Sequence, residues 1–195
     1  MNVHPIASRL YTPLATLLAA GLLAACATPD AIGPGSDTVS RHALVRTAPP
    51  APEWSALRDR LAAATGGKPG VEIGAANVGG FRVQIPVADG FTSGSTTIRP
   101  ALLNVLDVLA VPLAGEPGVA IRVIGHTDSQ GSEMVNLRLS IARAEAVVTH
   151  LRDRGIALER LSADGRGEAD PLTANATEEG RVRNRRVELI LSRLP

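Results

Sequence analysis

The sequence predicts an α/β sandwich, in which helices pack on one face of a mixed β-sheet. Three observations predict this class. Two leucine- or alanine-rich runs have helical spacing of their apolar residues, short strand-like runs separate them, and an alternating hairpin pattern comes first. The order is therefore strand, helix, strand, helix and strand with an initial hairpin, and 195 residues suffice for one such domain with extensions.

Each element has its own local signal. Trp54, Leu57, Leu61 and Ala64 have helical spacing, and Gly66-Gly67 ends that helix. Residues 71–73 and 81–85 alternate and predict the hairpin. The remaining predictions are a leucine-rich helix over 98–113, a strand over 119–124, the longest helix over 132–154, a strand over 161–164, a helical turn over 178–183 and a last strand over 187–191. Gly165-Arg166-Gly167 is interpreted as a turn, because it lacks the third glycine of a dinucleotide-binding loop.

The longest predicted helix has two distinct faces. Its apolar stripe predicts the face that packs on the core and comprises Leu137, Ile141, Ala144, Val148 and Leu151. A second stripe lies about 110° away, at 100° per residue, and is polar except for one leucine. It comprises Asn136, Leu139, Ser140 and Arg143 and is expected to face a groove.

Composition excludes several classes of function. A formal net charge of +1 argues against a nucleic-acid binder, which needs a basic face. The single cysteine excludes an internal disulfide. No cluster of histidine, cysteine and carboxylate residues has the spacing of a metal site, and no cofactor is expected. Of the 20 lysine and arginine residues, only Lys68 is a lysine.

The N-terminus has the pattern of an export signal. Residues 1–25 carry Arg9 followed by an apolar run, and Leu23-Ala24-Ala25-Cys26 resembles the lipobox of bacterial lipoprotein precursors. The resemblance implies cleavage before Cys26 and acylation of Cys26, for example with palmitate, and Ala27 favours the outer membrane. Ordinary signal cleavage near Ala25, with Cys26 incidental, is the alternative.

The rest of the chain divides into three parts. Residues 26–52 carry the cysteine and a Pro/Ala-rich flexible tether, residues 53–70 a helix and a linker, and residues 71–195 the main domain. Removal of residues 1–25 takes away one arginine and no acid, which leaves no net formal charge. Recognition is therefore expected to depend on specific ion pairs rather than on bulk charge.

Asp128 and Arg143 are the residues with the clearest chemistry. Asp128 follows a predicted strand, and Arg143 lies on the second stripe of the next helix. A carboxylate and a guanidinium that flank one groove suit a zwitterion, because one binds an ammonium and the other a carboxylate. The alternatives are that the two residues pair with each other, or that Asp128 only caps the helix.

Four ordered blocks resemble the OmpA-like peptidoglycan-binding domain, the C-terminal domain family of OmpA, Pal and MotB, over roughly residues 71–191. The blocks are Gly125-His126-Thr127-Asp128 with Gly131, then Asn136, Leu139, Ser140, Arg143 and Ala144, then Gly165, Gly167, Glu168 and Pro171, and last Gly180-Arg181 with Asn184-Arg185-Arg186-Val187. The resemblance implies non-covalent binding of the peptidoglycan stem peptide through its diaminopimelate. It also implies that Asp128 and Arg143 hold this ligand, that Thr127, Ser129, Asn136 and Leu139 line the groove, and that Arg185 adjoins it.

Three further residues carry open alternatives. Phe91-Thr92-Ser93-Gly94-Ser95 looks like the first loop of the family, but Thr92 stands where an acidic or amide residue is common, so the contacts of this loop are an open point. His126 is expected to be a structural histidine that bonds to backbone. Trp54 is expected in the core, with a partner-docking surface as the alternative.

These observations favour a binding protein rather than an enzyme. The leading hypothesis is a lipoprotein that faces the periplasm and tethers the outer membrane to the cell wall. The alternatives are a wall-anchoring subunit of an envelope-spanning secretion or motor assembly, which would have protein partners, and a peptidoglycan-processing enzyme that uses Asp128. The enzyme is disfavoured because the groove motif offers one carboxylate rather than the pair that sugar hydrolysis requires.

Overall fold

The computed structural model describes residues 52–195. The predicted signal segment, Cys26 and the tether up to residue 51 lie outside the described residues. Within residues 52–195, no helix is both long enough and apolar enough to span a bilayer.

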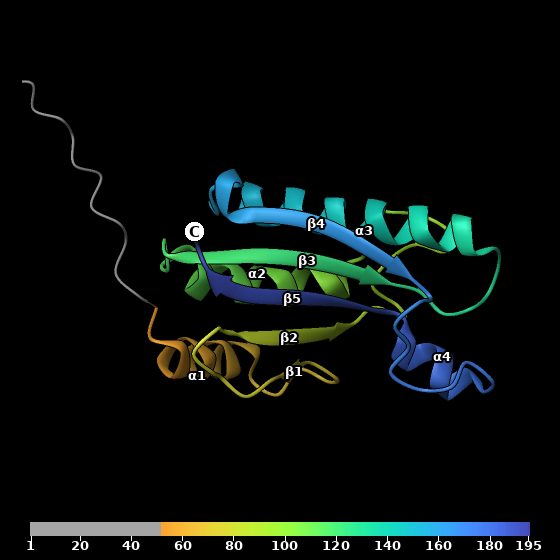
Figure 1. Cartoon of the computed structure of the whole chain (residues 1–195), viewed down its shortest axis with the longest axis horizontal. Helices are drawn as coiled ribbons and strands as arrows, with labels where there is room; N and C mark the ends of the chain where they lie inside the picture. The colour runs from red at the N-terminus through yellow and green to blue at the C-terminus, as the bar shows by residue number, and fades with distance from the viewer. Residues whose placement is uncertain (1–51) are drawn as a thin grey trace, which may run out of the picture. The chain divides into compact units, whose positions relative to one another are not determined.

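The described chain forms a five-stranded sheet with helices (Figure 1). The local sequence patterns predicted the order of these elements and most of their positions. In chain order they are α1 (Trp54–Thr65), β1 (Glu72–Ile73), β2 (Phe81–Pro86), α2 (Pro100–Ala114), β3 (Val119–His126), α3 (Glu133–Asp153), a 3₁₀ turn η1 (Leu158–Arg160), β4 (Leu161–Gly167), α4 (Glu178–Asn184) and β5 (Arg186–Arg193).

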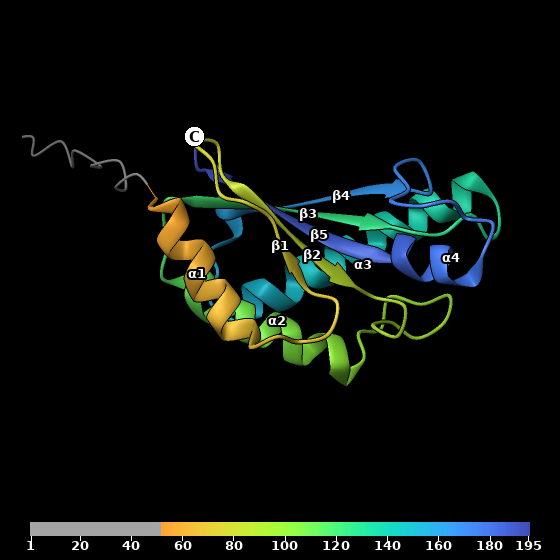
Figure 2. The same ribbon diagram turned by 90° about the horizontal axis from the view of Figure 1, so that it is seen from below.

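The sheet is mixed, as predicted. Its strand order is β1-β2-β5-β3-β4, so the last strand along the chain lies in the middle. The β1/β2, β2/β5 and β5/β3 pairs are antiparallel, whereas β3 and β4 are parallel and are joined through α3. Figure 2 shows α1, α2 and α3 on the same side of the strands, which agrees with the predicted sandwich.

One apolar core fills the space between helices and sheet. Leu189 of β5 pairs with Val83 of β2 on one side and with Val123 of β3 on the other, and all three are fully buried. Trp54 belongs to the same core: it is 9% exposed, meets the Phe81 ring edge-on at 6.1 Å, and donates from Nε1 to the Val78 carbonyl. The core interpretation of Trp54 is therefore confirmed.

The predicted core face of α3 is wrong in its first half. Leu137 is 37% exposed, whereas Asn136, Ser140 and Arg143 of the second stripe are buried. The reason is a close approach of α3 to glycines of two strands. A Cβ on Gly125 would lie 2.2 Å from the Ser140 carbonyl oxygen, and a Cβ on Gly165 would lie 2.4 Å from Ser140 Oγ. A large apolar side chain cannot fit at this contact, so the small serine takes it.

Several boundaries also differ from the prediction, and two of these differences have a clear structural reason. The segment Gly165-Arg166-Gly167 is not a free turn but the end of β4, since Gly125 pairs with Gly165 and His126 with Gly167 across a register shift. The helix predicted from residue 98 begins at Pro100, with Arg99 extended at ψ 158°. Proline disfavours the helical conformation in the residue before it, which explains the later start.

Candidate functional site

A groove with a volume of about 540 Å³ lies at the end of the sheet where β3 ends. Three segments form its walls: the loop after β2, the β3–α3 loop with the first turns of α3, and the residue that follows α4. Six predicted site residues line it, namely Thr127, Asp128, Asn136, Leu139, Arg143 and Arg185. Ser129, also predicted, is exposed and lies outside this lining.

Asp128 is nearly buried and is held at both carboxylate oxygens. Oδ1 accepts a hydrogen bond from the Gln130 backbone N–H at 3.0 Å, and Oδ2 accepts one from Arg185 Nη1 at 2.6 Å. The helix is instead capped by Ser132, whose hydroxyl accepts from the Val135 N–H. The alternative that Asp128 only caps the helix is therefore wrong, and its carboxylate keeps lone pairs for a further donor.

Arg143 is fixed in place without a carboxylate partner. Its Nε donates to the Ser95 carbonyl at 3.1 Å, and its guanidinium carbon lies 4.9 Å from the centre of the Phe91 ring. Within residues 52–195 Arg143 makes no ion pair, so it does not pair with Asp128. Burial lowers the pKa of Arg143 from its ordinary value, while the charge of Asp128 acts in the opposite direction. The terminal nitrogens of a charged guanidinium are therefore available for two-pronged binding of a carboxylate.

The amide of Asn136 connects the two loops at the groove. Its Nδ2 donates to the Asp128 carbonyl at 3.3 Å and to Glu168 Oε2 at 2.7 Å. Thr127 donates its backbone N–H to the Gly167 carbonyl, but its buried Oγ1 has no hydrogen-bond partner among the described residues. Half-buried Leu139 supplies an apolar wall.

Arg185 joins α4 to the groove. Besides Asp128, it bonds through Nη2 to Glu178 Oε1 at 2.8 Å. Burial lowers the pKa of Arg185, but the bonds to Glu178 and Asp128 outweigh burial and raise it overall. Two other arginines nearby in the sequence also make hydrogen bonds: Arg181 donates to Glu178 and to the Asn175 carbonyl, and Arg186 donates to Glu188 and to the Asp170 carbonyl. Arg186 thereby links the start of β5 to the segment that follows β4.

His126 differs from its prediction. It is 4% exposed, and neither ring nitrogen has a hydrogen-bond partner among the described residues, so the expected bond to backbone is absent there. Nε2 lies 3.8 Å from Glu188 Oε1. Burial and the neighbouring Arg186 lower the pKa of His126 from 6.5 to about 4. The imidazole is therefore neutral at pH 7 and does not add charge to the groove.

Three contributions were not predicted from the sequence. Phe91 and the Ser95 carbonyl hold Arg143, and Glu168 holds Asn136. Phe91 and Glu168 belong to the motifs that resemble the family, but those motifs did not predict which residues they contact. Thr92 is exposed and outside the groove lining, whereas Phe91, Ser93 and Gly94 of the same loop line it.

The arrangement suits recognition of a zwitterion or of an anionic peptide. The lining carries the cations Arg99, Arg143 and Arg185 and the anions Asp89 and Asp128, and so has an excess of one positive charge. The part of the chain that the structure describes contains no group of three or more His, Cys, Asp or Glu side chains that could hold a metal ion.

Comparison with known sequences identifies relatives for this region. The sequence pattern of the OmpA family matches residues 90–185. A probable lipoprotein of Escherichia coli, YiaD, is 43% identical over 104 residues, which are 53% of this chain and 48% of YiaD. The peptidoglycan-binding protein ArfA of Mycobacterium bovis is 36% identical over 107 residues, 55% of this chain and 32% of ArfA. The chain thus spans less than half the length of these curated relatives.

Solved structures share the fold over a larger part of the chain. A MotB-like protein from Desulfovibrio vulgaris superposes with a TM-score of 0.62 at 27% identity, over 72% of this chain and 88% of that one. The cell-wall anchor of the type VI secretion system (T6SS) from Pseudomonas aeruginosa has a TM-score of 0.61 at 31% identity, over 74% of this chain and 99% of that one.

Proposed function

Since the chain belongs to the OmpA family, we propose that its groove binds the stem peptide of peptidoglycan without chemical change. The chain is accordingly a binding protein and not an enzyme, in line with ArfA, a relative named for peptidoglycan binding. One observation carries the proposal. The side chains of Asp128 and Arg143 line the same groove, each is fixed by hydrogen bonds, and each keeps hydrogen-bonding capacity for a ligand.

Diaminopimelate fits this pair by its chemistry. Its side chain ends in one ammonium and one carboxylate. The ammonium would bind the free lone pairs of Asp128, and the carboxylate would bind the terminal nitrogens of Arg143. Thr127 Oγ1, buried without a partner among the described residues, and the apolar wall of Leu139 support the same site. Ser129 does not line the groove, so the structure gives no support for a ligand contact at this residue.

The remainder of the proposal concerns the anchor. Acylated Cys26 would hold the chain in the outer membrane, and residues 26–52 would let the domain reach the cell wall from the periplasmic side. YiaD, a probable lipoprotein, supports this part. In this proposal the family-like part begins at residue 71, after α1, and Trp54, Leu57 and Leu61 of α1 pack in the same core as the sheet.

Co-sedimentation with isolated sacculi tests the site. We expect Asp128→Ala and Arg143→Ala each to weaken binding by about 2–5 kcal/mol, because each leaves a buried charge of the ligand without its partner. At about 1.4 kcal/mol per tenfold, this is a loss of about 30-fold or more. The measurement is the bound fraction at increasing protein concentration, with circular dichroism to confirm folding.

Matched controls come from exposed residues of the same types. Asp153→Ala removes a carboxylate that, among the residues described, pairs only with the exposed Arg152, and Arg138→Ala removes an exposed arginine of α3. Both should bind sacculi like the wild type. Wild-type binding by folded Asp128→Ala and Arg143→Ala would refute the site, and release of soluble muropeptides by the wild type would indicate an enzyme.

A second candidate is a wall-anchoring subunit of an envelope-spanning assembly. The similarity to the secretion-system anchor over 99% of its length favours it. Cys26→Ala separates the two candidates once the wall is digested with lysozyme. A lipid-anchored tether then leaves the outer-membrane fraction, whereas a subunit held by protein partners stays with its membrane fraction.

A further inference from the structure

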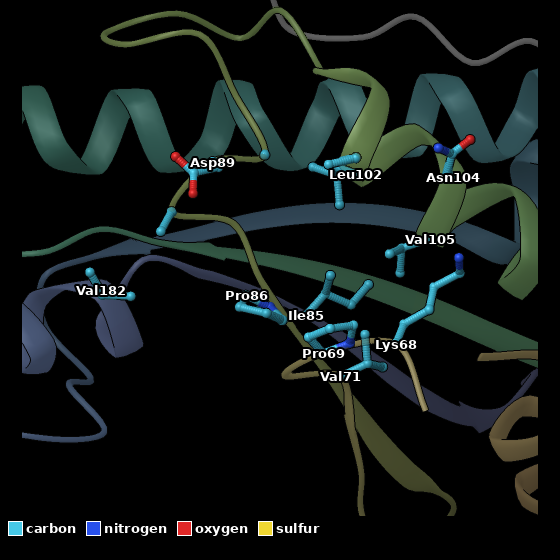
Figure 3. Close-up of a pocket in the computed structure, with 13 residues that line it drawn as sticks. Lys68, Pro69, Val71, Ile85, Pro86, Asp89, Leu102, Asn104, Val105 and Val182 are labelled. Atoms are coloured by element: carbon cyan, nitrogen blue, oxygen red, sulfur yellow. The ribbon is translucent and has the colours of Figure 1, made fainter. Parts of the chain in front are cut away.

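A second hollow, which we call the slot, adjoins the groove. It has a volume of about 550 Å³, within the range of about 300–1,000 Å³ that is usual for small-ligand sites. It lies between the first turns of α2, the end of β2 and residues 68–71 (Figure 3). Slot and groove share Ala88 and Asp89 in their linings, so the two hollows are adjacent at these residues.

The slot exists because β1 is short. β1 pairs only with Val83 and Gln84, so the next residues of β2, Ile85 and Pro86, have no strand at this edge and instead line the slot. The chain before β1 passes close to Pro86 at Gly70, where φ is +76° and a Cβ would lie 2.7 Å from Pro86 Cγ. The wall formed by residues 68–71 is therefore held against the sheet.

The walls are aliphatic and the ends are polar. Val71, Leu102 and Val105 face the slot, while Lys68 and Asn104 lie toward one end and Asp89 toward the other (Figure 3). Within residues 52–195 the side chains of Lys68, Asn104 and Asp89 make no hydrogen bond or ion pair. A cation with an amide at one end and an anion at the other complement a short peptide that donates N–H groups at one end and presents a carboxylate at the other.

Resting on the proposed function, we propose that the slot binds the part of the stem peptide that follows diaminopimelate, a short peptide with alanine methyls and a terminal carboxylate. The methyl groups contact the aliphatic walls. The carboxylate binds Lys68 and accepts from the Asn104 amide, and Asp89 accepts backbone N–H groups where the peptide crosses from the groove. Lys68, the only lysine of the chain, would therefore favour peptides that end in a free carboxylate at the slot.

Calorimetry on the full chain in detergent tests the slot with two probes. One is L-Ala-γ-D-Glu-diaminopimelate, and the other is the same peptide extended by D-Ala-D-Ala. We expect the extended probe to bind about tenfold more tightly, because a gain of this size corresponds to one additional hydrogen bond to a charged group. Lys68→Met should abolish this gain in affinity and leave the affinity for the short probe unchanged. Amidation of the terminal carboxylate of the extended probe should also abolish the gain. Arg122→Met, which removes an exposed charge of β3, should keep the gain.

A second measurement keeps the slot separate from the groove. D-Ala-D-Ala alone should shift the methyl NMR signals of Val71, Leu102 and Val105, and Asp128→Asn should not change this. Those shifts without any binding of the short probe would refute the proposed function but support the slot. Absence of the shifts, or a gain for the extended probe that survives Lys68→Met, would overturn the slot.

Discussion

Arg143 shows how single residues prepare this groove. Its one bond to the Ser95 carbonyl and its contact with the Phe91 ring fix the plane of the guanidinium and leave its ends unpaired within the described chain. Asp128 is fixed in the same way by Gln130 and Arg185. A ligand therefore meets charges that are already oriented, which reduces the ordering that binding requires.

The lowered pKa of His126 predicts how the free energy of unfolding depends on pH. The unfolded chain takes up a proton at this residue near pH 6.5, whereas the folded chain resists protonation until about pH 4. Between these values the unfolded state binds more protons, so the free energy of unfolding should fall as the pH falls from 6.5 to 4. The loss expected from this one group is on the order of 3 kcal/mol.

Urea unfolding at several pH values between 7 and 4 measures this dependence. His126→Gln cannot take up the proton, so its curve should be flatter than that of the wild type. His150→Gln, a replacement at a histidine that bonds to Asp107, should retain the contribution of His126. A wild-type slope that is unchanged in His126→Gln would show that the buried imidazole does not cause the dependence.

At the scale of elements, the contact between α3 and the sheet defines the site. Ser140 donates to the Leu137 carbonyl and accepts from the Gly167 N–H, so the helix is bonded to β4 where the groove begins. The apolar periodicity of α3 predicted its existence and length but not its orientation. Periodicity assumes that apolar residues face the core, whereas here the close approach to glycines on two strands admits only a small residue, Ser140.

Gly125→Ala should disturb this contact strongly. The new methyl would lie 2.2 Å from a backbone oxygen of α3, which no side-chain rotation relieves. We expect a loss of about 3 kcal/mol or more in the free energy of unfolding, at the upper end of overpacking effects. Sacculus binding should also weaken, because α3 carries Asn136 and Arg143.

Gly115→Ala is the matched control for this change. Gly115 has a φ of −73°, and an added Cβ would come no closer than 3.6 Å to the Pro112 oxygen. Its unfolding midpoint in urea should remain close to that of the wild type. Equal stability of the two alanine variants would contradict the close approach of α3 to β3.

For the whole molecule, charge balance predicts a weak salt dependence. The full chain has a net charge of +1, so long-range attraction to the wall is absent and binding depends on a few contacts in the groove. We expect sacculus binding to fall by less than about tenfold between about 50 and 200 mM salt, against about 10³–10⁵ for a protein that neutralises many phosphates. A steep loss would indicate a diffuse basic surface instead.

The arrangement of the strands could not be predicted from local patterns. Alternation and helical spacing indicated each strand and helix, and the motif blocks indicated six of the residues that now line one groove. That β5 lies between β2 and β3, that Arg185 pairs with Asp128, and that Glu168 supports Asn136 all depend on segments distant in the chain. No spacing within a single segment carries that information.

The central place of β5 has a consequence for biogenesis. β2 and β3 meet only through β5, the last element along the described chain, so the sheet remains in two halves until residues 186–193 are present. Such long-range pairing delays folding. On the proposed export route, the domain would stay unfolded while it threads through the inner membrane, and its core would close only after its final strand had emerged on the far side.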